Sequence, residues 1–502
     1  MTGGKNYLRL SSGRVRRMLR ISRRFALVVV TMLAISLLSL GGIAAGQSRK
    51  PFEGIKIVVF GDAGQNLKPF EWYKDKIKEE SGIVIDQVVG VPFTSVYEKL
   101  KTEFVAQTGA YDVVVFYPAY LGEFAGLGYL MPLDDFAKKY DPKLDDVSTG
   151  VRELNCKYGG KLYALPYDGD VLNLYYRKDL FNNATEKANF KKQFGRDLKV
   201  PETWEEFLDI AKFFTRKKGD KLAGETLKED FYGSAELAAR GFSYAWWLAR
   251  FGSLGGVYFD EDMKPLINSE KGVKALELFK ESLKYSPPDV MAYGYEELKN
   301  AYLEGKVAMV IQWSDIQKKA QDPRISKIEN RSGIAAVPGS RVGDKIVRSA
   351  PMPVGRVLAI PRTARHPEAA YWVARYLSVE TSLHDVSSSE TGLDPYRKSH
   401  YANPKSFAAL LGNEEAAKEY LDIVAVNLEN AYPELNIPGA GNYQDVLDLY
   451  INRALSGEMT PKAALDAVAK EWDQITKKLG AARQKEIYLK AVETWKALGI
   501  WQ

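Results

Sequence analysis

Gly159–Asp170, GGKLYALPYDGD, and the segment that follows it, Val171–Phe181, VLNLYYRKDLF, indicate the fold more sharply than any other part of the chain. Aromatic and aliphatic residues predict an extended segment on either side of Asp168 and Asp170. Residues two apart in a strand share a face, so the two carboxylates are expected to point to the same side. Together they can accept hydrogen bonds from neighbouring hydroxyl groups.

These residues alone leave three interpretations of the Asp168–Asp170 pair open. The pair could form a solvated Asp-Gly-Asp turn, bind a polyhydroxylated ligand, or provide the two carboxyl groups of a secreted glycoside-active enzyme. Incubation with candidate sugars separates the last two, because only an enzyme releases product.

Strands and helices alternate on the N-terminal side of this segment. Apolar, β-branched runs predict strands over 55–60, 83–89 and 112–116, and amphipathic spacing predicts helices over 69–80 and 96–106. The run 112–116 is apolar throughout, as in a strand buried on both faces. This alternation predicts βαβ units and a largely parallel sheet.

Helix start signals follow on the C-terminal side. Thr203 and Glu206 form a predicted capping box, in which each side chain bonds a free backbone amide at the helix start. Ser269 opens another predicted helix, and Thr460 followed by Pro461 opens a third. Their apolar stripes are interpreted as core faces.

The charge of the chain is concentrated at its N-terminus. The 502 residues contain 70 Lys and Arg against 64 Asp and Glu, but eight of the basic residues lie before residue 47, where there is no acid. The remaining chain therefore carries about −2, and this balance gives no reason to expect a nucleic-acid partner.

The basic start, the apolar stretch 25–40 and the small residues 41–46 have the order of a secretory signal, so we predict a signal peptide over 1–46. The alternative is an uncleaved membrane anchor, because 25–48 carries no charge.

Cys156 is the single cysteine, which excludes an internal disulfide.

Motifs for metal or nucleophilic catalysis are absent from the sequence. The three histidines, His366, His384 and His400, make no HExxH pair, and there is no GxSxG elbow or phosphate-binding GxxxxGK loop. These absences do not exclude carboxylate chemistry, but we expect no metal, no cofactor and no catalytic residue.

Several motifs, taken in order, resemble the family-one extracellular solute-binding proteins, which include maltose-binding proteins. Within the opening segment, the GK-x-Y-x-x-P pattern and the strand before Phe181 are similar to that family, although Arg177 stands where Asn is commoner. The other collinear matches are YDVV at 111–114, AGLGYLMPLD at 125–134, PETWEEF at 201–207, GKVAM at 305–309, TGLDP at 391–395, NIP at 436–438 and ALSGE at 454–458.

This resemblance implies an α/β fold of the periplasmic-binding-protein-like type II: two α/β lobes joined by crossing hinge strands. An N-terminal lobe would comprise 52–165 and 356–420, and a C-terminal lobe 166–355 and 421–502. The implied function is capture of a small saccharide or polyol in the interlobe cleft and delivery to an ABC permease. We also expect a periplasmic location and a monomer.

The resemblance also implies where the ligand binds. Trp313 has the position of a stacking Trp, and Tyr443 lies beside a position where Gln444 replaces another stacking Trp. Arg356 replaces a residue that is often small and is expected to contact either the ligand or a carboxylate across the cleft. Together with the missing Trp and the extra Tyr residues, Arg356 leaves a small saccharide, a polyol and an anionic sugar derivative open as ligands. The implied ligand-binding residues are Asp62, Tyr117, Tyr120, Asp168, Asp170, Phe242, Trp246, Trp313, Arg356 and Tyr443.

A ferric-ion binder using Tyr175 and Tyr176 is a further alternative. Its weakness is that neighbouring residues of a strand point to opposite faces. A purified sample that stays colourless after iron addition would exclude it.

Overall fold

A computed structural model describes residues 1–3, 50–352 and 355–499. The predicted signal peptide therefore lies almost entirely outside the described residues. Within them, no helix has the length and apolar character needed to cross a membrane.

A five-stranded sheet forms the core of the first lobe, in the order β2-β1-β3-β16-β6. Continuously apolar strands are buried at its centre, as predicted for 112–116. Its strands are β1 (Lys56–Asp62), β2 (Val84–Val91), β3 (Val113–Phe116), β6 (Ala164–Pro166) and β16 (Val357–Ala359). The helices of this lobe are α2 (Lys68–Ser81), α3 (Phe93–Ala106), α4 (Leu121–Gly126), α5 (Asp134–Lys139), α13 (Pro367–Val379) and α14 (Ser382–Val386).

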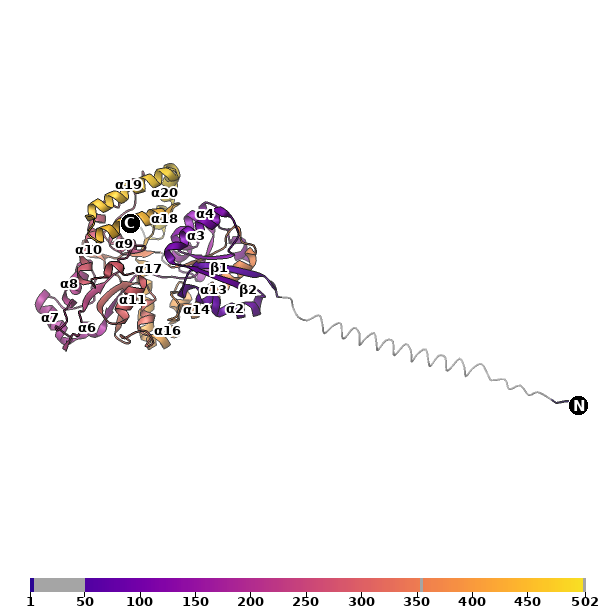
Figure 1. The fold of residues 1–502 in the computed structure, drawn as a ribbon, viewed down its shortest axis with the longest axis horizontal. Helices are drawn as coiled ribbons and strands as arrows, with labels where there is room; N and C mark the ends of the chain where they lie inside the picture. Colours follow the sequence, from indigo (N-terminus) through magenta and orange to yellow (C-terminus); the bar gives the residue numbers. More distant parts are fainter. Residues whose placement is uncertain (4–49, 353–354, 500–502) are drawn as a thin grey trace.

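A four-stranded sheet forms the core of the second lobe, in the order β10-β11-β7-β12. Its strands are β7 (Asn173–Arg177), β10 (Tyr232–Ala235), β11 (Val307–Gln312) and β12 (Ser332–Ala335). The helices around it are α6 (Lys178–Asn182), α7 (Ala184–Phe194), α8 (Trp204–Phe214), α9 (Ser243–Ser253), α10 (Glu270–Ser282), α11 (Tyr295–Leu303) and α12 (Ile316–Ala320). Figure 1 shows these helices on one side of the molecule and β1, β2 and α2–α4 on the other.

The predicted largely parallel sheet is found in both lobes, with one strand in each sheet running opposite to the others. Strands β1, β2 and β3 are parallel, but β16 runs antiparallel to β3 and to β6. In the second sheet β7 runs antiparallel to β11 and to β12. The antiparallel pairs all involve β7 or β16, and the chain passes from one sheet to the other just before each of these strands.

The C-terminal part of the chain packs mainly on the second lobe. It contains α15 (Lys398–Tyr401), α16 (Pro404–Leu411), α17 (Glu414–Glu429), β17 (Ala431–Pro433), α18 (Ala440–Leu455), α19 (Pro461–Leu479) and α20 (Ala481–Ala497). Helix α17 contacts β7 and β12, and α16 contacts α12. The predicted lobe division stays a prediction. The contacts of α16 and α17 favour ending the first lobe after α15 instead of at residue 420, because α15 bonds Asp145, Asp146 and Ser382 of that lobe.

Other short elements complete the chain. Strand β15 (Ala350–Met352) pairs with β17 between the lobes. Three small hairpins lie outside the two sheets: β4 (Lys157–Tyr158) with β5 (Lys161–Leu162), β8 (Lys221–Leu222) with β9 (Glu225–Thr226), and β13 (Ser340–Val342) with β14 (Lys345–Val347).

The predicted helix starts differ in how they are capped. Thr203 and Glu206 form both hydrogen bonds of the capping box on α8, and Thr460 caps α19 through the amide of Ala463. Ser269 precedes α10 but makes no capping bond with its side chain.

Cys156 is fully buried, and burial raises the pKa of its thiol, so this thiol is not poised to react.

Candidate functional site

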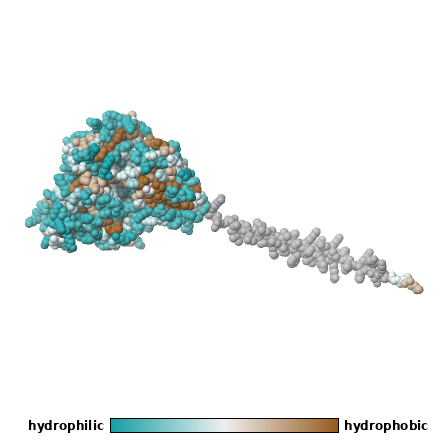
Figure 2. All heavy atoms as spheres, in the orientation of Figure 1, coloured by the Kyte–Doolittle hydropathy of each residue, from teal (hydrophilic) through white to brown (hydrophobic). Residues whose placement is uncertain are grey.

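A cavity of about 400 Å³ lies between the two lobes. The first lobe contributes the end of β1 and the start of α3, and the second contributes the segments before α9, before α11 and after β11. The cavity is lined by six of the residues implied by the resemblance: Asp62, Asp168, Asp170, Phe242, Trp313 and Arg356. Figure 2 shows that the visible face is mostly hydrophilic, with small separate apolar patches.

Asp62 and Arg356 form a bidentate ion pair in the wall of the cavity. The Nε and Nη2 atoms of Arg356 lie 2.9 and 3.0 Å from the two carboxylate oxygens of Asp62. The guanidinium also lies 4.9 Å from the ring centroid of Phe93. Burial lowers the pKa of Arg356, but the Asp62 carboxylate outweighs this and raises it above the ordinary value. Arg356 was predicted to contact either a ligand or a carboxylate, and in the structure it contacts the carboxylate of Asp62.

Asp168 and Asp170 lie in the crossing between β6 and β7. This crossing is not a strand, so the predicted shared strand face is wrong, although both residues line the same cavity. Asp168 Oδ1 accepts from the amide of Asp394 at 2.8 Å, and Asp170 Oδ1 accepts from the amide of Ser314 at 2.9 Å. Gly169 is required between them, because a Cβ there would lie 2.1 Å from the carbonyl oxygen of Pro395.

Burial raises the pKa of both carboxyl groups well above the ordinary value. The negative charge of Asp394 raises both further, and Asp168 adds to the effect on Asp170. The two groups are therefore strong acceptors for hydroxyl donors and poor neighbours for another anion.

Aromatic rings form the opposite wall. Trp313 follows β11, and its ring centroid lies 5.5 Å from that of Phe242. Phe242 in turn lies 5.1 Å from Phe93 of the first lobe. Such rings can cover the apolar C–H face of a sugar or polyol while the carboxylates bind its hydroxyl edge.

Trp246, Tyr117 and Tyr120 do not line the cavity but lie behind it. Trp246 is fully buried, packs at 5.1 Å on Trp313, and donates from Nε1 to the carbonyl of Ile311. Tyr117 packs at 5.6 Å on Phe242, and Tyr120 packs at 5.6 Å on Tyr117. These side chains position the rings that border the cavity.

Tyr443 lies elsewhere, and its prediction as a ligand residue is wrong. It is fully buried on α18, with its ring 5.3 Å from Trp472 of α19 and its hydroxyl 2.8 Å from Thr476. Tyr443 therefore belongs to the interface between two helices.

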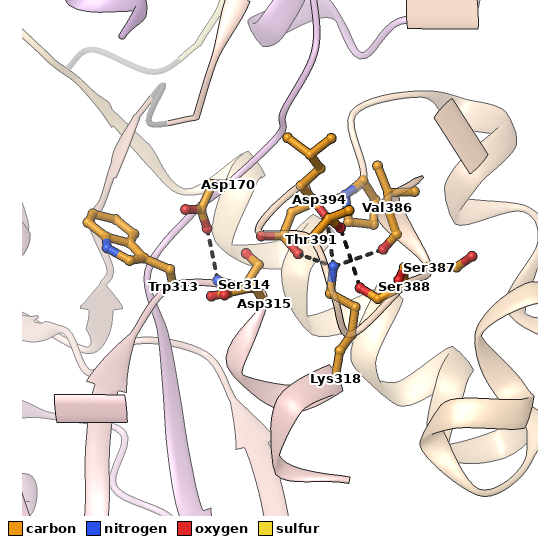
Figure 3. Close-up of polar contacts among 12 residues, drawn as sticks. Asp170, Trp313, Ser314, Asp315, Lys318, Val386, Ser387, Ser388, Thr391 and Asp394 are labelled. Atoms are coloured by element: carbon orange, nitrogen blue, oxygen red, sulfur yellow. Dashed lines mark hydrogen bonds and ion pairs between the residues drawn. The ribbon is translucent and has the colours of Figure 1, made fainter. Parts of the chain in front are cut away.

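Two adjacent lysines hold the segment that passes beneath the cavity. Lys318 is fully buried, and its Nζ lies 2.9 Å from the carbonyl of Val386, 2.6 Å from that of Leu393 and 3.1 Å from Asp394 Oδ1 (Figure 3). Lys319 Nζ donates to the carbonyls of Ser389 and Thr391 and pairs with Asp315 at 3.2 Å. We call these contacts the lysine clasp. No sequence motif indicates it, because backbone carbonyls are the main acceptors.

Sequence reasoning also missed a contact that joins the lobes at the cavity. Tyr295 donates its hydroxyl to Asp315 in the second lobe, and Gln65 of the first lobe donates to the same hydroxyl at 3.2 Å. All three residues line the cavity. In the sequence, the position of Asp315 two residues after Trp313 is the signal that could have identified this contact between the lobes.

No group of three or more His, Cys, Asp or Glu side chains suited to a metal ion occurs in the described part of the chain. Tyr175 of the ferric-ion alternative is fully buried and donates its hydroxyl to the carbonyls of Trp313 and Ser314. Tyr176 instead packs at 5.0 Å on Phe181. The two phenols are therefore engaged separately.

Comparison with known proteins gives a family match. The model of the family described as bacterial extracellular solute-binding protein matches residues 64–380. A probable amino-acid ABC transporter periplasmic-binding protein of Sinorhizobium fredii is 26% identical over 302 residues, which are 59% of this chain and 64% of that protein. A mannitol-binding protein of Pseudomonas aeruginosa is 28% identical over 281 residues, 54% of this chain and 57% of that protein. The matches thus span less than two thirds of these curated relatives.

Solved structures match over most of the described chain. A solute-binding protein of an ABC transporter from Agrobacterium radiobacter, solved with ribitol, has a TM-score of 0.71 at 25% identity and covers 85% of this chain and 100% of its own. The maltose-bound MalE3 protein of T. maritima has a TM-score of 0.68 at 22% identity, with 84% and 100% covered. The second similarity shows the fold alone, that of two lobes with crossing strands.

Proposed function

Since this chain belongs to the bacterial extracellular solute-binding proteins, we propose that it captures a small saccharide or polyol in the interlobe cavity and delivers it to an ABC permease. The family predicted from the sequence motifs is confirmed. The ligand class is a proposal supported by the mannitol named for one relative and the ribitol bound in one similar structure.

The observation that carries this proposal is the composition of one cavity. Trp313 and Phe242 supply aromatic faces, whereas Asp168 and Asp170 supply acceptors for hydroxyl groups. Both lobes contribute walls, so a ligand stabilises the closed arrangement by contacts that the open one lacks. A cavity of about 400 Å³ suits a small ligand better than a long oligosaccharide.

The proposal assigns the chain no catalytic activity. A glycoside hydrolase places its two carboxyl groups on either side of the scissile bond. Here Asp168 and Asp170 come from one short crossing, and each is held by a backbone amide. This arrangement favours binding over the alternative of a secreted glycoside-active enzyme.

The remaining parts of the proposal concern location and partners. A signal peptide over 1–46 would direct the chain to the periplasm, where the permease subunits are the protein partner; an uncleaved leader would anchor it there instead. We propose a monomer with no nucleic-acid partner, consistent with the near-neutral charge of the chain after the leader.

A thermal-shift screen followed by calorimetry tests the function. Ribitol, mannitol, sorbitol, glucose and maltose are the first probes, because a ligand far above its dissociation constant stabilises the native state by several kcal/mol. Trp313→Ala should weaken binding by at least about tenfold through the loss of a ring face. Trp72→Ala, on the surface of α2, is the matched control. Binding by no neutral sugar or polyol, or release of a hydrolysis product, contradicts the proposal.

A further inference from the structure

Most formal charges around the cavity are paired inside the protein. The Arg356 guanidinium is neutralised by Asp62, and the Asp315 carboxylate is neutralised by Lys319. Both pairs are nearly buried, so the cations cannot turn away to meet a ligand without leaving a carboxylate unpaired. Arg356, which lines the cavity, and Lys319 behind it are thus already engaged.

The charges at the rim are paired as well. Arg240 lies 2.6 Å from Asp445, and Glu296 lies 2.5 Å from Lys299. The Arg240 and Glu296 side chains are largely exposed, so their fields are weakened by solvent and salt. The rim therefore adds no strong positive potential to the cavity.

Asp168 and Asp170 are the exceptions. In the described part of the chain, neither has a cationic nitrogen within 4.0 Å, and each accepts a hydrogen bond from one backbone amide. Lys318, the nearest buried lysine, is occupied by Asp394 and two carbonyl oxygens. Figure 3 shows one oxygen of Asp170 bonded to the Ser314 amide and the other directed toward the side of the Trp313 indole. Arg356 and Lys318 act on Asp168 from beyond direct contact, so both carboxyl groups border the cavity with no cation bound to them.

We infer that the cleft selects by charge: it accepts neutral and cationic polyhydroxylated ligands and rejects anionic ones, because Asp168 and Asp170 border the cavity with no cation in direct contact with either. The inference rests on the proposed function and adds to it the sign of the ligand's charge. It excludes one ligand class that the sequence leaves open, an anionic sugar derivative. The physical reason is that a carboxylate or phosphate placed beside these acids meets like charge in a poorly solvated space.

The raised pKa values of the two carboxyl groups have two causes of different meaning. Burial, the larger cause, disfavours a charge of either sign, whereas the effect of Asp394 acts against negative charge alone and is partly opposed at Asp168 by Arg356 and Lys318. An anionic ligand adds to the effect of Asp394, whereas an ammonium group relieves it.

Calorimetric titration with charge-matched probes tests the inference. The open-chain series is sorbitol, gluconate and glucamine, the ring series is glucose, glucuronate and glucosamine, and maltose is paired with maltobionate. In the series whose neutral member binds, the anion should bind on the order of 100-fold more weakly, and the amine at least as tightly, because like-charge contacts are strongly unfavourable. An anion that binds as tightly as its neutral partner overturns the inference and leaves the proposed function standing. If no neutral member binds, the proposed function and this inference both fail.

Isosteric variants assign the selection to the two acids. Asp168→Asn and Asp170→Asn keep an oxygen that accepts the Asp394 and Ser314 amides, and each should reduce the neutral-to-anion preference by about tenfold. Asp135→Asn, on the surface of α5, removes an equal charge far from the cleft and should leave that preference unchanged. The melting temperature of each free variant reports whether it folds. Folded variants with an unaltered preference overturn the role of these residues.

Discussion

Replacing Arg356 by Met tests whether the Asp62–Arg356 ion pair stabilises the first-lobe wall of the cavity. Met keeps an unbranched apolar stem against Phe93 but removes both hydrogen bonds to Asp62. The Asp62 carboxylate, in a residue that is 6% exposed, is left with Asn66 Nδ2 at 3.1 Å as its side-chain donor. Removing one partner of a buried pair costs about 3–5 kcal/mol, so we expect the free energy of unfolding to fall by about 3 kcal/mol at neutral pH.

Urea denaturation followed by tryptophan fluorescence and by circular dichroism measures this loss. Coincidence of the two transitions is required, because a two-lobed chain need not unfold in one step. The double variant Arg356→Met/Asp62→Asn removes the unpaired charge, so we expect it to lie within about 1 kcal/mol of the parent protein. A single variant that loses less than about 1 kcal/mol, or a double variant no more stable than the single one, would refute this reasoning.

Glu434 is fully buried in the segment after β17, and burial raises the pKa of its carboxyl group to about 7. The carboxyl group has a lower pKa in the unfolded chain, so its protonation stabilises the native state, and this stabilisation is lost as the pH rises through about 7. Glu434→Gln does not titrate. Its free energy of unfolding, measured by urea denaturation, should therefore rise by about 3 kcal/mol relative to that of the parent protein between pH 4.5 and pH 8. Equal pH profiles would contradict this assignment. Thr203→Ala removes the side-chain cap of α8 and should lower the free energy of unfolding by about 1 kcal/mol, with ligand affinity unchanged in calorimetry. Tyr443→Phe should leave ligand affinity within about twofold, since Tyr443 lies outside the cavity, while the lost bond to Thr476 costs about 1 kcal/mol of stability; a large affinity loss would show that the residue acts on the cleft.

The parts of the fold predicted best from sequence are those with a local physical cause. The strand at 112–116 needs only a continuous apolar run, and the start of α8 needs only Thr203 and Glu206 at the right spacing. The reversed direction of β16 and of β7 could not be predicted from a local sequence pattern. It depends on which sheet receives the chain after a crossing, which is a long-range property of the fold.

The candidate site was predicted unevenly for a similar reason. Asp62 is the last residue of β1 and Trp313 directly follows β11, positions from which a side chain reaches the cleft, and both line the cavity. Their roles in binding stay predictions. Tyr443 fails because its position was carried over from a relative, while the apolar stripe of its own helix faces α19. The lysine clasp was missed because buried Lys is rare and its carbonyl acceptors leave no residue pattern.

The lysine clasp has a consequence for how the two halves can separate. Lys318 and Lys319 of the second half bind the stretch Val386–Asp394 at five oxygen atoms. That stretch begins in α14 of the first half and is held there by the pair between Glu390 and Lys68 and by the close approach of Gly392 to Gln65 and Asn66. The two ammonium groups therefore join the halves in a buried place, where losing their partners is costly. We expect the gap to open by bending of the chain around this junction, with the bonds of both lysines kept.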